Sequence, residues 1–236
     1  QIIVSNGSKE VVKRVIEFEV PEIQDGTIEI VSIARIPGVR SKIAVRSTTE
    51  GVDPVGAIVG AKGSRISSIV EKLQGEKIDV VVWTHDIDKF VAAALSPARA
   101  VAIIDKPKND QDQKSQGHKI AITPNKHQTL AIGKAGNNVR LAAELTNTRI
   151  DVVSVDQAAE KGIEYTWNTG ITQEEYDAIE SGIKLNRALN RNRNNQKSTD
   201  FTTTQFDDSI QDFNTQIEED STKKEVEDID YAIDDD

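Results

Sequence analysis

The sequence contains no cysteine and only three histidines among its 236 residues. The absence of cysteine excludes disulfide bonds and thiolate metal sites. The histidines, His85, His118 and His127, do not stand at metal-ligand spacing from one another or from a carboxylate, so we predict no metal site and no cofactor. No apolar run approaches the ~20 residues that a membrane-spanning helix needs, so we expect no membrane partner.

Methionine is also absent, even at position 1. We therefore expect the chain to be a piece of a longer protein, with further sequence upstream. Residues 1–4 lack the charged start and the cleavage site of a secretory signal. The location that these features favour is the cytoplasm.

Negative charge is concentrated at one end of the chain. Residues 198–236 hold 14 acidic and two basic side chains, a net charge of −12. The rest of the chain carries +2, which gives the total of −10. Its apolar residues are scattered, and such a segment cannot bury enough surface to offset its ordering entropy, so we predict a disordered acidic tail. The tail could simply aid solubility, or it could compete with a polyanion for basic residues of the body, namely Lys62, Arg65, Lys134 and Arg140.

Two further segments have distinctive compositions. Residues 183–197 read IKLNRALNRNRNNQK, with five basic residues and no acidic one. This pattern fits a solvated helix end, or a weak phosphate-binding arm. The polar stretch 106–117 is long enough to predict a mobile loop in the folded part.

The body contains an internal repeat. Residues 58–81 read IVGAKGSRISSIVEKLQGEKIDVV, and residues 131–153 read AIGKAGNNVRLAAELTNTRIDVV. The alignment pairs Gly60 with Gly133 and Gly63 with Gly136. Two copies are too few for a solenoid, so the repeat predicts two similar domains in tandem.

Local signals predict the same elements in each copy. Asp53-Pro54 is a helix start, with aspartate as cap and proline at the first helical position. The predicted helices cover residues 8–19, 54–59, 64–73 and 86–95, the first with Ser8 as cap. The predicted strands cover residues 27–36, 41–46, 77–83, 100–105 and 119–123, with a hairpin turn at Pro37-Gly38.

Each copy places a Gly-x-x-Gly turn between two helices. Glycine permits a sharp turn and removes side chains that would block a close ligand. The second helix begins at once, so its free N–H groups and the positive end of its dipole face the turn, where an anion such as phosphate fits. A P-loop is excluded because Ala61 stands where the motif starting at Gly56 needs glycine, and neither turn has the first glycine pair of a dinucleotide-binding fingerprint.

This arrangement resembles the KH domain, in which the Gly-x-x-Gly loop clamps about four nucleotides of RNA backbone. The resemblance implies an α/β (α+β) fold of two tandem type II KH domains, each a small three-stranded sheet packed on helices. It also implies single-stranded RNA as the ligand. The candidate RNA-binding residues are Gly60, Ala61, Lys62, Gly63, Ser64, Arg65, Gly133, Lys134, Ala135, Gly136, Asn137, Asn138 and Arg140.

Longer stretches resemble the NusA family of bacterial transcription termination and antitermination factors. They are FEVPEIQDGTIEIVSIARIPGVRSKIAV (residues 18–45), VDPVGAIVGAKGSRISSIVEKLQGEKIDVVVW (52–83) and LAIGKAGNNVRLAAELTNTRIDV (130–152). The chain departs from the family in lacking a tryptophan near Thr148, and its tail does not resemble the acidic repeats of some members. The resemblance implies a monomeric elongation factor that acts on nascent RNA and modulates pausing, termination and antitermination. RNA polymerase would be bound through absent N-terminal domains, and other transcription factors are further possible partners.

The repeat and the resemblance together predict the domain boundaries. Residues 1–7 would end an upstream OB-fold RNA-binding domain, 8–96 would form the first KH domain and 97–157 the second. Residues 158–197 would be a helical linker with the basic segment, followed by the disordered tail at 198–236.

Two other classes of protein are alternatives to this prediction. An enzyme is disfavoured because there is no nucleophile elbow, and the acid pair Asp86 and Asp88 is typical of a helix start, so no catalytic residue is predicted. A KH-domain protein of translation or ribosome assembly remains the alternative. Such proteins are usually strongly basic, whereas this body is nearly neutral.

Overall fold

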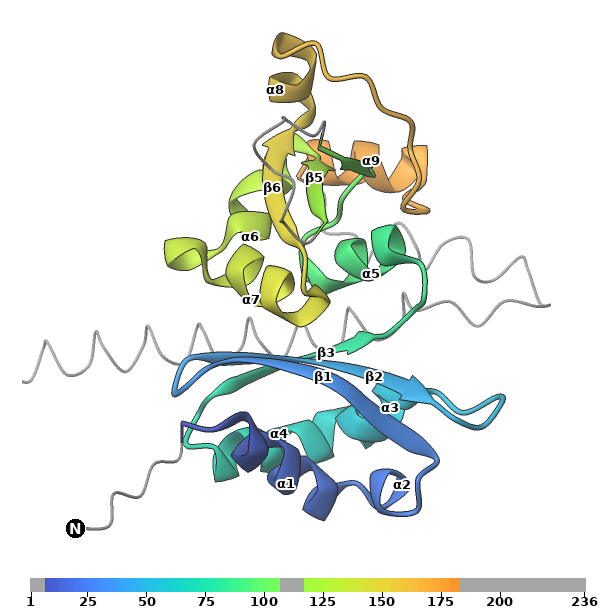
Figure 1. The fold of residues 1–236 in the computed structure, drawn as a ribbon, viewed down its shortest axis with the longest axis vertical. Helices are drawn as coiled ribbons and strands as arrows, with labels where there is room; N and C mark the ends of the chain where they lie inside the picture. The colour runs from blue at the N-terminus through green and yellow to red at the C-terminus, as the bar shows by residue number, and fades with distance from the viewer. Residues whose placement is uncertain (1–6, 107–116, 183–236) are drawn as a thin grey trace, which may run out of the picture. The chain divides into compact units, whose positions relative to one another are not determined.

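The computed structural model describes residues 7–106 and 117–182. The first half of the chain has the order helix, helix, strand, strand, helix, helix, strand (Figure 1). Its elements are α1 (Lys9–Glu19), α2 (Pro21–Gln24), β1 (Ile28–Ile36), β2 (Arg40–Ser47), α3 (Pro54–Val59), a 3-10 turn (Ala61–Gly63), α4 (Ser64–Lys72) and β3 (Lys77–Val82). The predicted hairpin is therefore confirmed.

The second half repeats this order without a counterpart of α2 and adds two helices after its last strand. Its elements are α5 (Ile87–Ala94), β4 (Ala102–Asp105), β5 (His118–Thr123), a 3-10 turn (Asn125–His127), α6 (Gln128–Ile132), a second 3-10 turn (Lys134–Gly136), α7 (Asn137–Thr146), β6 (Arg149–Ser154), α8 (Val155–Glu160) and α9 (Gln173–Glu180). The predicted acidic tail and basic segment, residues 107–116 of the predicted loop, and residues 1–6 of the predicted upstream domain lie outside the described residues.

Both sheets have three strands and the same pairing. In the first, β1 pairs antiparallel with β2, and β2 pairs parallel with β3. In the second, β4 pairs antiparallel with β5, and β5 pairs parallel with β6. A parallel neighbour needs a crossover, and the helix pair around each glycine turn supplies it. The predicted fold of two tandem three-stranded KH domains is confirmed.

Side-chain caps fix where several helices begin. Ser8 accepts a hydrogen bond from the N–H of Glu10 at the start of α1. Asp53 accepts one from Val55 at the start of α3, with proline at the first helical position. Asp86 accepts hydrogen bonds from the two N–H groups that follow Ile87 in α5. The predicted caps at Ser8 and Asp53 are confirmed, and α3 ends at Gly60, which is its C-cap.

The two domains share one apolar core. Helices α1, α3 and α4 lie on one face of the first sheet, and α5 and α7 contact its strands from the other side (Figure 1). The shared cluster includes Ala44 and Val81 from the first sheet, Leu95 after α5, and Leu141 from α7, all buried. Buried apolar side chains of both repeats therefore stabilise one another across the domain boundary.

Two buried ionic clusters lie in the first sheet. The Lys42 ammonium, with a fully buried side chain, donates to Asp79 at 2.8 Å and to the Ser96 carbonyl at 2.6 Å. The Glu76 carboxylate is also fully buried, and the Arg35 guanidinium lies 2.8 Å from it. Burial raises the pKa of Asp79 and of Glu76, but the paired cationic side chains and the hydrogen bonds lower both pKa values more. Both pKa values therefore lie below their usual range.

A second apolar cluster, in the second domain, includes residues that follow β6. Ala158 of α8, Ile171 before α9, and Ile179 of α9 are buried there with residues of β4, β5 and β6. The side-chain amide of Asn168 also pairs with the edge strand β4, accepting from the Ile103 N–H at 2.9 Å and donating to its carbonyl at 2.7 Å. Part of the stretch predicted as a linker thus packs on the second sheet and covers one of its edges.

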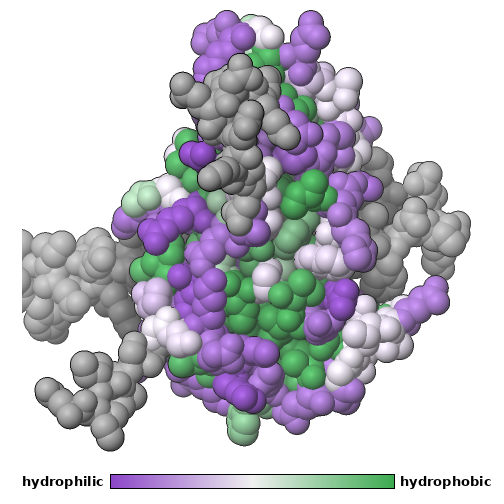
Figure 2. Space-filling model, viewed as in Figure 1, coloured by the Kyte–Doolittle hydropathy of each residue, from purple (hydrophilic) through white to green (hydrophobic). Residues whose placement is uncertain are grey.

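On the face shown in Figure 2, hydrophobic and hydrophilic residues are interspersed.

Candidate nucleic-acid interface

The two glycine turns have the same backbone conformation. The first glycines, Gly60 and Gly133, have φ/ψ of 74°/173° and 75°/171°. The third residues, Lys62 and Ala135, are left-handed at φ 53° in both turns. The last glycines also agree, at 77°/12° and 74°/12°. The repeat seen in the sequence is therefore a repeat of one specific loop geometry.

The first glycine of each turn is required by a close approach from the following helix. A Cβ atom at Gly60 would lie 2.8 Å from Cγ and 2.9 Å from Cβ of Arg65. At Gly133 it would lie 2.7 Å from Cβ and 2.9 Å from the backbone nitrogen of Asn138. No real Cβ atom tolerates such contacts, and few residues other than glycine adopt this backbone conformation.

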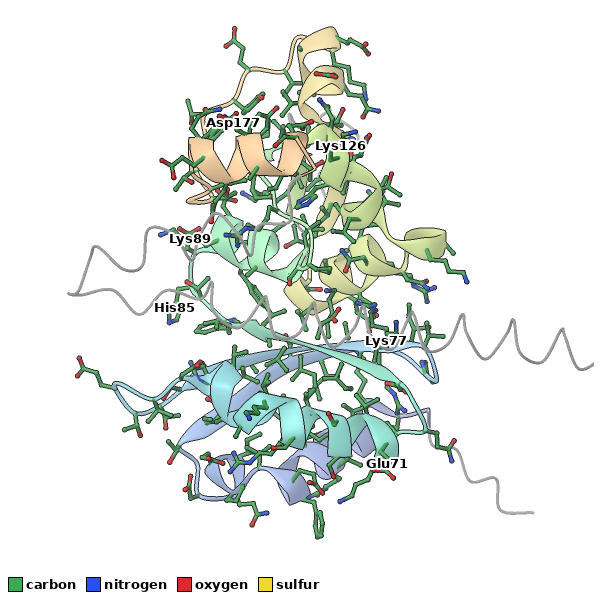
Figure 3. The ribbon with its side chains drawn as sticks, turned by 180° about the vertical axis from the view of Figure 1, so that it is seen from behind. Glu71, Lys77, His85, Lys89, Lys126 and Asp177 are labelled. Atoms are coloured by element: carbon green, nitrogen blue, oxygen red, sulfur yellow. The ribbon has the colours of Figure 1, made fainter. Side chains whose placement is uncertain are left out.

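Each turn opens directly onto the N-terminus of a long helix. The caps of α4 and α7 are glycines, Gly63 and Gly136, and neither supplies a side-chain acceptor to the first N–H groups. The N–H groups of Ser64 and Asn137, the first in each helix, donate to the carbonyls of Ala61 and Lys134 in their turns. The next N–H groups have no partner within the helix, and the helix dipole adds partial positive charge at that point. Figure 3 shows Glu71 near the opposite end of α4, away from the turn. The geometry of both turns suits a phosphate.

Most of the predicted site residues lie at the surface of their turn. Ala61, Lys62 and Ser64 are exposed in the first turn, and Lys134 and Ala135 in the second. Gly60, Gly133, Gly136 and Asn137 are partly exposed, and Gly63 is buried. Both lysines are therefore accessible to a negatively charged ligand at their turn.

Two predicted contacts have other partners in the structure. The Arg65 guanidinium lies between both oxygens of Glu22, each at 3.0 Å, and the Ala57 carbonyl at 2.6 Å. Asn138 is only 5% exposed, and its amide donates to the carbonyls of α6 residues Leu130 and Ala131 and to the Leu95 carbonyl. The Asn138 side chain thus faces protein, which corrects the expectation that it contacts RNA directly.

The two turns differ one helical turn further on. Arg140, the last predicted site residue, is exposed on α7. Its counterpart in α4 is Ser67, whose hydroxyl donates to the Gly63 carbonyl at 2.7 Å. The exposed apolar side chains Leu130 and Ile132, at 40% and 38%, flank the second turn from α6. No sequence pattern pointed to these two residues or to Glu22, which only the fold brings beside the first turn.

Within residues 7–106 and 117–182, no cluster of three or more histidine or carboxylate side chains is placed to hold a metal ion. In the same part of the chain, no helix has the length and apolar character needed to cross a membrane.

Comparisons with known proteins agree with this geometry. Residues 6–83 match the family model of the NusA-like first KH domain, and residues 87–160 match that of the NusA-like second KH domain. The chain is 47% identical over 163 residues to the transcription termination/antitermination protein NusA of Halalkalibacterium halodurans, which covers 69% of this chain and 41% of that protein. It is 48% identical to the protein of that name from Bacillus subtilis over 163 residues, covering 69% of this chain and 42% of that protein.

A third relative, the protein of the same name from Mycobacterium tuberculosis, is 43% identical over 151 residues, covering 64% of this chain and 42% of that protein. The chain thus spans about two-fifths of the length of these curated relatives. The two family models match consecutive parts of the chain, and each includes one of the two glycine turns. The chain belongs to the NusA family and contains its pair of KH domains.

Proposed function

We propose that the chain binds single-stranded RNA through both glycine turns. The observation that carries this proposal is the pair of turns with the same backbone conformation, each leading into the N-terminus of a helix and each containing an exposed lysine. A single strand fits best because its bases are unstacked and can be contacted while its phosphates lie against the turn. The ligating residues would be those of the two turns whose side chains or N–H groups face solvent, together with Arg140.

The biological role that we propose is that of a transcription elongation factor. The relatives are named for transcription termination and antitermination, and we extend this role to the present chain. It would act in the cytoplasm as a monomer on nascent RNA at RNA polymerase, without catalysing a reaction, and modulate pausing, termination and antitermination. Family membership favours this role over the alternative in translation. Copurification of RNA polymerase would support it, and copurification of small ribosomal subunits would support the alternative.

The RNA-binding proposal can be tested by reversing charge at each turn. We expect the variants A61D/K62D and K134D/A135D each to weaken binding of a labelled single-stranded oligoribonucleotide, because an added carboxylate repels phosphate. A protein that combines both pairs of substitutions should bind the oligoribonucleotide about tenfold or more weakly at low salt, as measured by fluorescence anisotropy. Their far-UV circular dichroism should be unchanged, since these positions are exposed.

A matched control exists in the same chain. Lys161 and Thr166 are exposed and lie outside both turns. The variant K161D/T166D changes the net charge by the same amount as either turn variant, and it should bind RNA almost as well as the unmodified protein. Equal losses in all three variants, or wild-type affinity in both turn variants, would refute binding at the turns.

A further inference from the structure

The fifth residue after the first glycine has the same structural role in both turns. Arg65 donates to the Ala57 carbonyl at 2.6 Å, and Asn138 donates to the Leu130 carbonyl at 3.3 Å. In the alignment of the repeats these two carbonyls occupy matching positions, three residues before the first glycine. Each side chain thus ties the helix after the turn to the helix before it.

The second attachment of each side chain differs in charge. Arg65 also bonds the Glu22 carboxylate of α2, with side chains that are 34% and 31% exposed. Asn138 instead bonds the Leu95 carbonyl at 2.9 Å and is buried. The contact is therefore ionic and reachable by solvent in the first domain, and neutral and enclosed in the second.

This difference changes the charge available to a ligand. At the first turn, Glu22 offsets one of the two positive charges of Lys62 and Arg65. At the second turn, Lys134 and Arg140 are both exposed, and within the described residues no carboxylate pairs with either. Burial raises the pKa of Glu22, but hydrogen bonds from its own backbone N–H and from Arg65 lower it further, so the pKa lies below its usual range and the carboxylate is ionised at neutral pH.

We propose that the Glu22 carboxylate weakens phosphate binding at the first turn, so that the second turn contributes the larger share of the affinity for RNA. This inference rests on the proposed function. The apolar surroundings agree with it, because Leu130 and Ile132 are exposed beside the second turn, whereas Val59, which matches Ile132, is only 2% exposed. Unstacked bases therefore meet more apolar surface at the second turn.

Neutralising Glu22 tests the inference. The variant E22Q keeps a side-chain acceptor for Arg65 but removes the charge, and we expect it to bind a single-stranded oligoribonucleotide roughly threefold more tightly at about 50 mM salt. The gain should shrink at about 500 mM salt, because exposed charges are then screened. The variant E22D retains the charge and should show no gain. E29Q is the matched control, since Glu29 is also paired with an arginine, Arg46, but lies on β1.

Combining variants locates the effect. The gain from E22Q should disappear in the A61D/K62D background and persist in the K134D/A135D background, because only the first turn is next to Glu22. Equal gains from E22Q and E22D, a gain that survives in A61D/K62D, or a larger affinity loss from A61D/K62D than from K134D/A135D would overturn the inference. Wild-type affinity in both turn variants would instead refute the proposed function itself.

Discussion

Replacing the two glycines of the second turn with alanine should have unequal effects on stability. Gly133 has φ/ψ of 75°/171°, a region that costs a residue with a side chain about 1–3 kcal/mol. Its added Cβ would also press against the backbone nitrogen and Cβ of Asn138, and overpacking of this kind costs about 1–3 kcal/mol. Gly136 is in the ordinary left-handed region with no atom within 4 Å of an added Cβ, so alanine there costs about 1–2 kcal/mol.

Denaturant unfolding followed by circular dichroism measures both losses. G133A should lower the free energy of unfolding by about 2–6 kcal/mol, and G136A by about 1–2 kcal/mol. The first turn supplies an internal comparison, because a Cβ atom at Gly60 would press in the same way on Cγ, Cβ and the backbone nitrogen of Arg65, whereas at Gly63 its nearest neighbour would be 3.8 Å away. G60A should therefore cost about as much as G133A and more than G63A. Equal losses for G133A and G136A would show that the close approach to Asn138 does not determine the requirement for glycine.

Three further outcomes follow from buried groups. D79N should lower the free energy of unfolding by about 3–5 kcal/mol in chemical denaturation, because it leaves the buried Lys42 without its carboxylate, and K42M in the same background should restore much of the loss. The pKa of Glu76 is lower in the folded protein than in the unfolded chain, so its ionised carboxylate stabilises the fold fully above the unfolded-state pKa of about 4.3. This stabilisation is lost as the pH falls through the folded-state pKa. The decrease of the unfolding free energy in acid should therefore be shallower in E76Q. L141A should cost about 2–5 kcal/mol and, because Leu141 belongs to the shared core, shift the thermal unfolding of both domains together.

The local elements of both domains could be predicted from the sequence because their signals are local. The caps at Ser8 and Asp53 and the apolar spacing of the helices depend only on neighbours within a few residues. The glycine turns could also be placed, because Gly-x-x-Gly between two helices recurs at matching positions. Short-range patterns of this kind determined the order of the elements, and the order limited the choice of fold.

The roles of several residues could not be predicted, because they depend on contacts between distant parts of the chain. Arg65 was expected to bind phosphate, but its partner Glu22 is 43 residues away in sequence. Lys42 stands in a strand where a surface position would be expected, yet its partners Asp79 and Ser96 come from β3 and from the segment after α5. A charged residue gives no sequence signal that it will be buried, because burial depends on whether a partner of opposite charge reaches it.

Helix α7 connects the second turn to the first domain. Its N-terminus opens the turn at Gly136, and its far end packs on the first sheet. The Leu145 carbonyl accepts a hydrogen bond from Ser32 of β1 at 3.0 Å, and Glu144 pairs with Lys9 of α1. A helix fixed at one end to the first sheet cannot change its direction without breaking these contacts and exposing the shared core. The position of the second turn is therefore determined by the packing of the first domain as well as by its own domain. An RNA strand that reaches both turns would meet a preorganised surface. Its binding would cost less free energy than binding to two independent modules that must first be aligned.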